Sequence, residues 1–150
     1  MADNFGFQKL LTGLQQMKAK VPVLLANEAQ NYFVRSFTQQ GWDGQRWQEV
    51  KRREPGTQEY KYPKSKGLSR RTSPILVRTG RLRRAVSNSI RSATWQSVRL
   101  VVDLKYAAAQ NDGNPDRNLP RRHYMGNSPI LEQKQMQVLR SYTSKLFKIH

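Results

Sequence analysis

The chain has 150 residues, of which 27 are Lys or Arg and 10 are Asp or Glu, so its formal net charge is +17. The positive side chains repel one another in a lone monomer. They would be stabilised by an anionic neighbour such as nucleic acid, an acidic protein or a membrane surface. The absence of cysteine excludes disulfide bonds and thiolate catalysis. The length predicts a single domain covering residues 1–150.

The first forty residues predict two helices. Apolar residues recur at spacings of three and four over residues 4–19, and a second apolar stripe runs from about Val21 to Gln40. Pro22 disfavours a helical Val21 and suits the first turn of a new helix, so we expect a break here. No signal sequence is recognisable and the apolar run Val23–Ala26 is too short to span a bilayer. We therefore expect a soluble protein made in the cytoplasm, with no membrane partner.

Residues 41–74 are rich in turn formers. Trp42 and Trp47 lie in a glycine-containing segment, and a polar tract with several prolines follows over about residues 48–74. Its lack of periodicity predicts a long basic loop, and such loops in compact domains are usually functional or disordered. We expect this loop to become ordered when the protein docks onto a partner.

The segment Ile75–Val77 predicts a short strand, followed by a turn at Thr79 and Gly80. Thr79 is the expected N-cap of a short basic helix, and Gly80 lets the backbone turn. The apolar residues of this helix are spaced by three and four, so we expect them to pack inward: Leu82, Ala85 and Val86.

Two strands over residues 89–94 and 97–103 predict a β-hairpin with its turn near Trp95 and Gln96. Small residues at 106–108 permit close packing, and turn formers at 111–116 and a second basic loop at 119–126 follow. Ser128 is the expected N-cap of a last helix, with Pro129 in its first turn. The predicted fold class is α+β: N-terminal helices, a small antiparallel sheet with a short helix, a long basic loop and a C-terminal helix.

Positive charge is concentrated between Lys51 and Arg84, where twelve basic residues accompany two acidic ones. The segment either faces solvent, contacts an acidic protein or binds nucleic acid. Tyr60 and Tyr62 lie among its cations, and bases of single-stranded nucleic acid stack on such rings. The candidate residues for an interface or for facing DNA are Arg52, Arg53, Lys64, Lys66, Arg70, Arg71, Arg78, Arg81, Arg83, Arg84, Arg121 and Arg122.

No catalytic constellation can be assembled from the sequence. His123 is flanked by arginines that disfavour its protonation, and His150 is the last residue. Asp112 and Asp116 flank Pro115, where turn formation is a better explanation than metal binding. We therefore expect no catalytic, cofactor-binding or metal-binding residue and no enzymatic activity; a nuclease would need clustered acids.

Several segments occur in an order that is typical of one family. They are "GWDGQRWQEV" at 41–50, "ILVRTGRLRRAVSNSI" at 75–90, "KYAAAQNDG" at 105–113 and "LPRRHYMGNSP" at 119–129, followed by a helix. This ordered set resembles the virion morphogenesis (tail completion) family of tailed bacteriophages over about residues 30–147. In two places the chain departs from the family: the histidine of the family's Tyr-Ala segment is absent after Tyr106, and Tyr124 and Met125 replace Phe and Leu.

The resemblance implies a structural virion protein that acts in tail completion and head–tail joining. It implies a homo-oligomeric ring, expected to be a hexamer, around the DNA path, at the neck or head-proximal end of the tail. Other neck and tail proteins would be partners, with non-specific contact to packaged DNA. Trp42 and Trp47 belong either to the core or to contacts between ring subunits, and Tyr124 is a further candidate interface anchor. The alternative from charge alone is a nucleic-acid-binding protein that uses residues 51–84.

Overall fold

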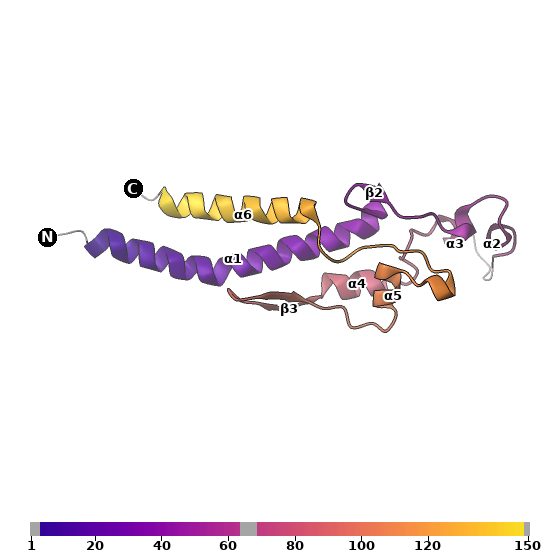
Figure 1. Ribbon diagram of the computed structural model, residues 1–150, viewed down its shortest axis with the longest axis horizontal. Helices are drawn as coiled ribbons and strands as arrows, with labels where there is room; N and C mark the ends of the chain where they lie inside the picture. The colour runs from indigo at the N-terminus through magenta and orange to yellow at the C-terminus, as the bar shows by residue number, and fades with distance from the viewer. Residues whose placement is uncertain (1–3, 64–68, 149–150) are drawn as a thin grey trace. The chain divides into compact units, whose positions relative to one another are not determined.

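A computed structural model describes residues 4–63 and 69–148, with the side chains of residues 4, 5, 69 and 70 left undescribed. The fold is α+β, with two long helices and two small antiparallel sheets (Figure 1). In chain order the elements are α1 (Asn4–Gln39), β1 (Gly41–Trp42), β2 (Gln45–Arg46), η1 (Lys51–Arg53), α2 (Gln58–Lys61), α3 (Ser69–Thr72), α4 (Arg81–Ser87), β3 (Ile90–Ala93), β4 (Val98–Leu100), α5 (Ala107–Asp112), η2 (Pro115–Arg117) and α6 (Pro129–Phe147).

The chain forms two compact units, each assembled from separate segments. The first unit comprises residues 1–32, 89–101 and 127–150, and the second comprises residues 33–88 and 102–126. The expectation of one domain over residues 1–150 stays a prediction.

The predicted break at Pro22 is wrong, because α1 is one helix with Pro22 inside it. A proline in a helix interior removes one backbone hydrogen bond and costs about 3 kcal/mol. Here Val21, Pro22 and Ala26 are all buried, so burial of apolar surface offsets that cost. The stripe at residues 7–17 is helical as expected, but much of it is exposed, and Phe7 retains 58% of its accessible surface.

In the first unit α6 runs antiparallel along α1, as Figure 1 shows. The hydroxyl of Ser128 donates to the hydroxyl of Tyr32, while near the other end Leu146 lies 3.0 Å from the position a Cβ on Gly13 would take. A glycine at that point allows the two helices to approach closely. The predicted start of α6 is confirmed: Ser128 is the N-cap and its Oγ accepts from the backbone N–H of Leu131.

The hairpin of the first unit is confirmed, with β3 and β4 antiparallel and Ala93 opposite Val98. Thr94 N donates to Ser97 O, which closes the turn over Trp95 and Gln96. The strands are shorter than predicted, and the register shifts by one residue between Ile90 and Ser92.

In the second unit the segment at 75–77 is not a strand, so that prediction is wrong. Leu76 has a φ of +61°, which is incompatible with extended backbone. The short helix α4 forms as predicted, with Leu82 and Val86 buried. Its N-cap is Gly80 rather than Thr79, whose hydroxyl accepts only a long 3.4 Å bond from Arg81 N.

The long segment at 48–74 contains the short helices η1, α2 and α3 between irregular stretches. Its expected character as a loop is therefore only partly right. The second basic loop at 119–126 has no helix or extended strand, apart from a single bridge between Asn114 and Leu119. A short helix that the sequence reading missed, α5, follows Tyr106.

Candidate functional site

Aromatic rings form the core of the second unit. The Phe37 ring lies 5.8 Å from the Trp47 ring and 5.2 Å from the Tyr124 ring, measured between centroids. Trp47 and Tyr124 retain only 8% and 2% of their accessible surface. Trp47 is therefore a core residue, which was one of the two roles predicted for it, and Tyr124 is buried in the same core. Their rings have almost no exposed surface for another subunit to contact.

Trp42 is partly exposed and packs against two further rings. Its ring stacks on Phe33 at 5.9 Å and meets the His123 ring edge-on at 4.6 Å. Burial and the charge of Arg121 lower the pKa of His123, against opposing contributions from Asp112, the Asn111 backbone and Asp43. The neutral imidazole expected from the sequence is thus favoured, with burial as the main cause.

Three residues of α5, Ala107, Gln110 and Asn111, form hydrogen bonds with the loop at 119–126, Gln110 by accepting the backbone N–H of Arg122. Oδ1 of Asn111 accepts the backbone N–H groups of Tyr124 and Met125 at 2.9 and 3.1 Å. The Tyr124 hydroxyl donates to the carbonyl of Ala107 at 2.8 Å. Burial raises the pKa of Tyr124 to about 12, so the hydroxyl stays protonated as a donor.

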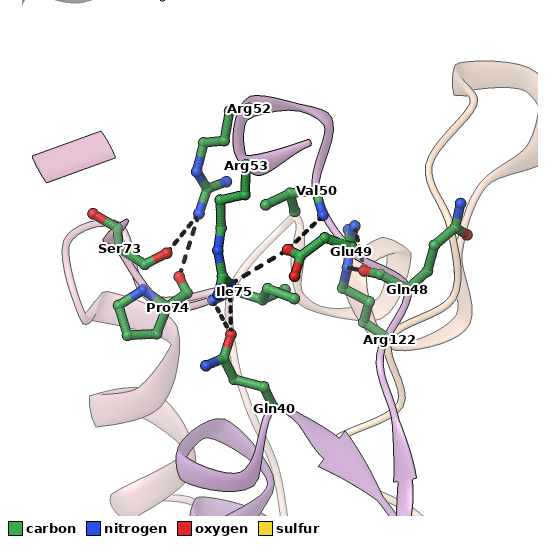
Figure 2. Close-up of polar contacts among 10 residues, drawn as sticks. All are labelled: Gln40, Gln48, Glu49, Val50, Arg52, Arg53, Ser73, Pro74, Ile75 and Arg122. Atoms are coloured by element: carbon green, nitrogen blue, oxygen red, sulfur yellow. Dashed lines mark hydrogen bonds and ion pairs between the residues drawn. The ribbon is translucent and has the colours of Figure 1, made fainter. Parts of the chain in front are cut away.

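A second set of polar contacts holds the segments around residues 40, 50 and 75 together, as Figure 2 shows. Oε1 of Gln40 accepts both from Arg53 Nη1 and from Ile75 N, each at 3.0 Å. Arg53 also forms an ion pair with Glu49 at 3.3 Å. Arg53, a candidate interface residue, therefore connects residues of its own unit through Gln40 and Glu49.

Two more candidate arginines bond to main-chain oxygens (Figure 2). Arg52 donates through Nη2 to the carbonyl of Ser73 at 3.1 Å and, at a long 3.4 Å, to that of Pro74. Arg122 is 6% exposed and donates through Nε and Nη2 to the carbonyl of Gln48 at 3.3 and 3.2 Å. Burial, and next the positive charge of Arg52, lower the pKa of Arg122, against an opposing contribution from Glu49. Arg122 is therefore mostly buried and is hydrogen-bonded within its own unit.

These arginines lie beside a concave pocket of about 420 Å³ in the second unit. Four guanidinium groups line it, from Arg52, Arg78, Arg81 and Arg122. Aliphatic and polar residues complete the wall: Val50, Ile75, Leu76, Val77, Thr79, Gly80, Leu82, Tyr106, Gln110 and Leu119. The described lining contains no carboxylate, so the pocket is cationic with an apolar wall.

The remaining candidate residues are spread over the second unit. Arg78, Arg81, Arg83, Arg84 and Arg121 are exposed. Arg71 is partly buried, donates to the carbonyl of Tyr60 at 2.6 Å and lies 4.3 Å from the centre of that ring. Lys64 and Lys66, and the side chain of Arg70, lie outside the described residues.

Sequence reasoning missed the residues that connect these segments. Gln40 lies in no motif. Tyr106 and Asn111 lie in the segment 105–113, where the sequence predicts close packing and a turn. The available signal for a helix was the alanine triplet at 107–109, because alanine favours helices, and such a helix carries Asn111 near its end.

Residues 4–63 and 69–148 contain no group of three or more His, Asp or Glu side chains that could hold a metal ion. Within the same residues no helix is both long and apolar enough to cross a membrane. Comparison with family models, with curated proteins and with solved structures found no match to this chain.

Proposed function

We propose that this chain is a structural protein of a tailed bacteriophage virion, acting in tail completion and head–tail joining as a component of a ring around the DNA path. It would be made in the cytoplasm of the host bacterium and reside at the neck or the head-proximal end of the tail. The mechanism is assembly: preformed surfaces dock against neighbouring copies and neighbouring virion proteins.

One observation supports the proposal: most of the residues that resemble the tail completion family, at 41–50, 75–88, 105–113 and 119–126, lie in one compact unit. The indole of Trp47 bonds to the loop at 119–126, and the Tyr106–Gly113 segment holds the same loop through Asn111. The segment at 75–82 shares the pocket with Arg122 and Tyr106. Segments that lie up to about eighty residues apart in the sequence are thus in contact in the fold, which is consistent with the resemblance.

Exposed apolar side chains on the long helices support assembly into oligomers. Large exposed hydrophobic residues mark interaction surfaces when they gather together. In α1 they include Phe7, Leu10, Leu11 and Leu14, whose spacing of three and four places them on one side of the helix. In α6 they are Ile130, Met136 and Phe147. A homo-oligomeric ring, six copies by the family resemblance, would cover such surfaces.

The direct test is a phage or prophage from which the gene has been deleted. We expect particles with unjoined heads and tails, or tails of irregular end structure, in electron micrographs, and restoration by the gene in trans. Native mass spectrometry of the purified chain should show a closed oligomer. Fully infectious, correctly finished particles without the chain would overturn the proposal.

The second candidate is a nucleic-acid-binding protein that uses residues 51–84. Tyr62 favours it, because its ring is 73% exposed beside exposed Lys61 and is open to stacking. Tyr60 favours it less, since Arg71 already covers its ring. Such a protein should lose roughly a thousandfold in affinity between about 50 and 200 mM salt if it contacts six or more phosphates. Weak binding with a shallow salt dependence would favour the assembly role.

A further inference from the structure

The arginine-lined pocket has a specific chemistry that a general basic surface lacks. Arg78 and Arg81 are exposed at the pocket, and neither guanidinium group has a hydrogen-bond or ion-pair partner among the described residues. Arg122 uses Nε and Nη2 for the carbonyl of Gln48, while its Nη1 forms no hydrogen bond within the part of the chain described. Guanidinium groups recognise carboxylates through paired hydrogen bonds. The pocket therefore offers donors to an anion.

Two of the pocket's cations are held rigidly. Main-chain carbonyls fix Arg52 and Arg122, and Arg52 is close enough to Arg122 to lower the pKa of that guanidinium. Glu49 opposes this repulsion with a smaller contribution, so an anion bound beside the two guanidinium groups would stabilise them further. Such preorganised charge loses little conformational freedom when a ligand binds.

The wall between these cations is apolar and strained. Leu76, Val77 and Leu119 line the pocket, so an aliphatic side chain of a ligand would find a matching surface. Leu76 has a φ of +61°, a left-handed conformation that is unfavourable for a bulky residue. Such strain is often retained at binding sites, where the surrounding structure holds it.

The composition of the chain indicates which kind of molecule could supply a carboxylate to the pocket. With 10 acidic residues against 27 basic ones, a second copy of this chain is a poor donor of negative charge. A DNA duplex is also a poor fit, since it is far wider than a pocket of about 420 Å³ and offers no aliphatic group to its wall. An acidic segment of another protein supplies both carboxylates and aliphatic side chains.

We propose that this pocket binds a peptide segment of a different, acidic protein, with a carboxylate at Arg78, Arg81 and Arg122 and an adjacent aliphatic side chain against Leu76, Val77 and Leu119. This inference deepens the proposed function, since the partner would be a neighbouring virion protein. It concerns binding by the purified chain, so its failure would leave the result of the gene deletion unaffected.

The test measures fluorescence anisotropy of short labelled peptides with the full chain. The probe peptide alternates leucine and glutamate; one comparison peptide has glutamine for glutamate, another has serine for leucine, and a labelled DNA duplex is the third ligand. The variants are Arg78→Gln and Arg81→Gln. Arg83→Gln is the matched control, because Arg83 is also exposed and lies on the same helix as Arg81 but does not line the pocket. All three side chains are exposed, so circular dichroism should show unchanged folding.

We expect the leucine–glutamate peptide to bind, and Arg78→Gln and Arg81→Gln to weaken it about tenfold to a hundredfold each. Arg83→Gln should change affinity by less than about twofold. Both comparison peptides should bind more weakly than the probe. Equal losses in all three variants would show general electrostatic attraction and overturn the proposal. So would equal binding of the serine peptide, or a DNA duplex that binds through Arg78 and Arg81 while the probe peptide does not.

Discussion

The indole Nε1 of Trp47 donates a hydrogen bond of 2.7 Å to the carbonyl oxygen of His123, 76 residues further along the chain. The bond joins the tryptophan segment to the second basic loop and orders both around the aromatic core. The Trp47 ring is buried, the bond lies in a partly buried place and His123 is partly exposed, so removing the indole takes from the His123 carbonyl its donor within the protein.

Trp47→Phe should therefore destabilise the protein. The variant keeps most of the ring packing against Phe37 but leaves the His123 carbonyl without its donor. Loss of one buried partner costs about 1–3 kcal/mol in free energy of unfolding. Urea unfolding followed by circular dichroism measures it. Trp95→Phe, at the exposed hairpin turn, is the control and should change stability by less than about 0.5 kcal/mol; equal effects in both would contradict the role of this bond.

Asn111→Ala should release the second basic loop from α5. One side-chain oxygen accepts two backbone N–H groups, of Tyr124 and Met125, and both lose their partner in the variant. We expect a loss of about 2–4 kcal/mol and faster hydrogen exchange at those two amides. The exposed Asn31→Ala on α1 is the matched change and should be close to neutral. Unchanged exchange at Tyr124 and Met125 would show that other contacts hold the loop.

Ser89→Ala should stabilise the protein. The Ser89 side chain is fully buried in the first unit and its Oγ has no hydrogen-bond partner among the described residues. Burying an unpaired hydroxyl is unfavourable, and its removal should raise the free energy of unfolding by about 1 kcal/mol. Ser97→Ala, exposed beside the hairpin turn, should have almost no effect. A loss of stability in Ser89→Ala would mean that the hydroxyl forms a bond after all.

His123 should make stability depend on pH. Its folded pKa lies below the usual 6.5, mainly because of burial, so protonation favours the unfolded chain. The stabilising contribution is complete above pH 6.5 and is lost as the pH falls through the lower, folded pKa. His123→Phe keeps a ring beside Trp42 and removes the titration. Urea midpoints of the two proteins should therefore diverge below pH 6.5, with the wild type falling further; parallel curves would rule out this assignment.

Gly80→Ala should shift stability in the opposite direction from Gly6→Ala. Gly80 has a φ of +70°, which costs an L-residue roughly 1–2 kcal/mol, whereas its new Cβ would meet only the movable end of Arg84. At Gly6, inside α1, no atom lies within 4 Å of the added Cβ and alanine favours the helix by roughly 0.5–1 kcal/mol. Thermal unfolding compares the pair, and a stabilised Gly80→Ala would contradict the left-handed turn before α4.

Local patterns predicted a large part of the fold. The start of α6 follows from Ser128, Pro129 and the first-turn acid, all of which act within one helical turn. The hairpin follows from alternation along two short runs. The apolar side of α4 follows from Leu82 and Val86, four residues apart on one face. Each of these signals operates between residues close in sequence, where propensity and periodicity are informative.

The errors lie where distant contacts outweigh local preference. Pro22 reads as a helix boundary, yet burial of its neighbours keeps α1 continuous. The apolar triplet at 75–77 predicted a strand. In the structure the backbone N–H of Ile75 donates to the side chain of Gln40, and Leu76 has a left-handed backbone conformation. The sequence also did not indicate that Arg122 is buried and donates to the carbonyl of Gln48; its role at an interface stays a prediction. None of these partners is near in the sequence.

The sequence by itself determined the class of fold, the start of the last helix, the hairpin and the surplus of cations. Only the tertiary structure decided which of those cations are structural and which meet at a pocket. The physical reason is that a residue's charge and helical preference are properties of itself and its near neighbours. Its burial and its hydrogen-bond partners, in contrast, depend on chain segments brought together from forty to eighty residues away, as Trp47 and His123 are.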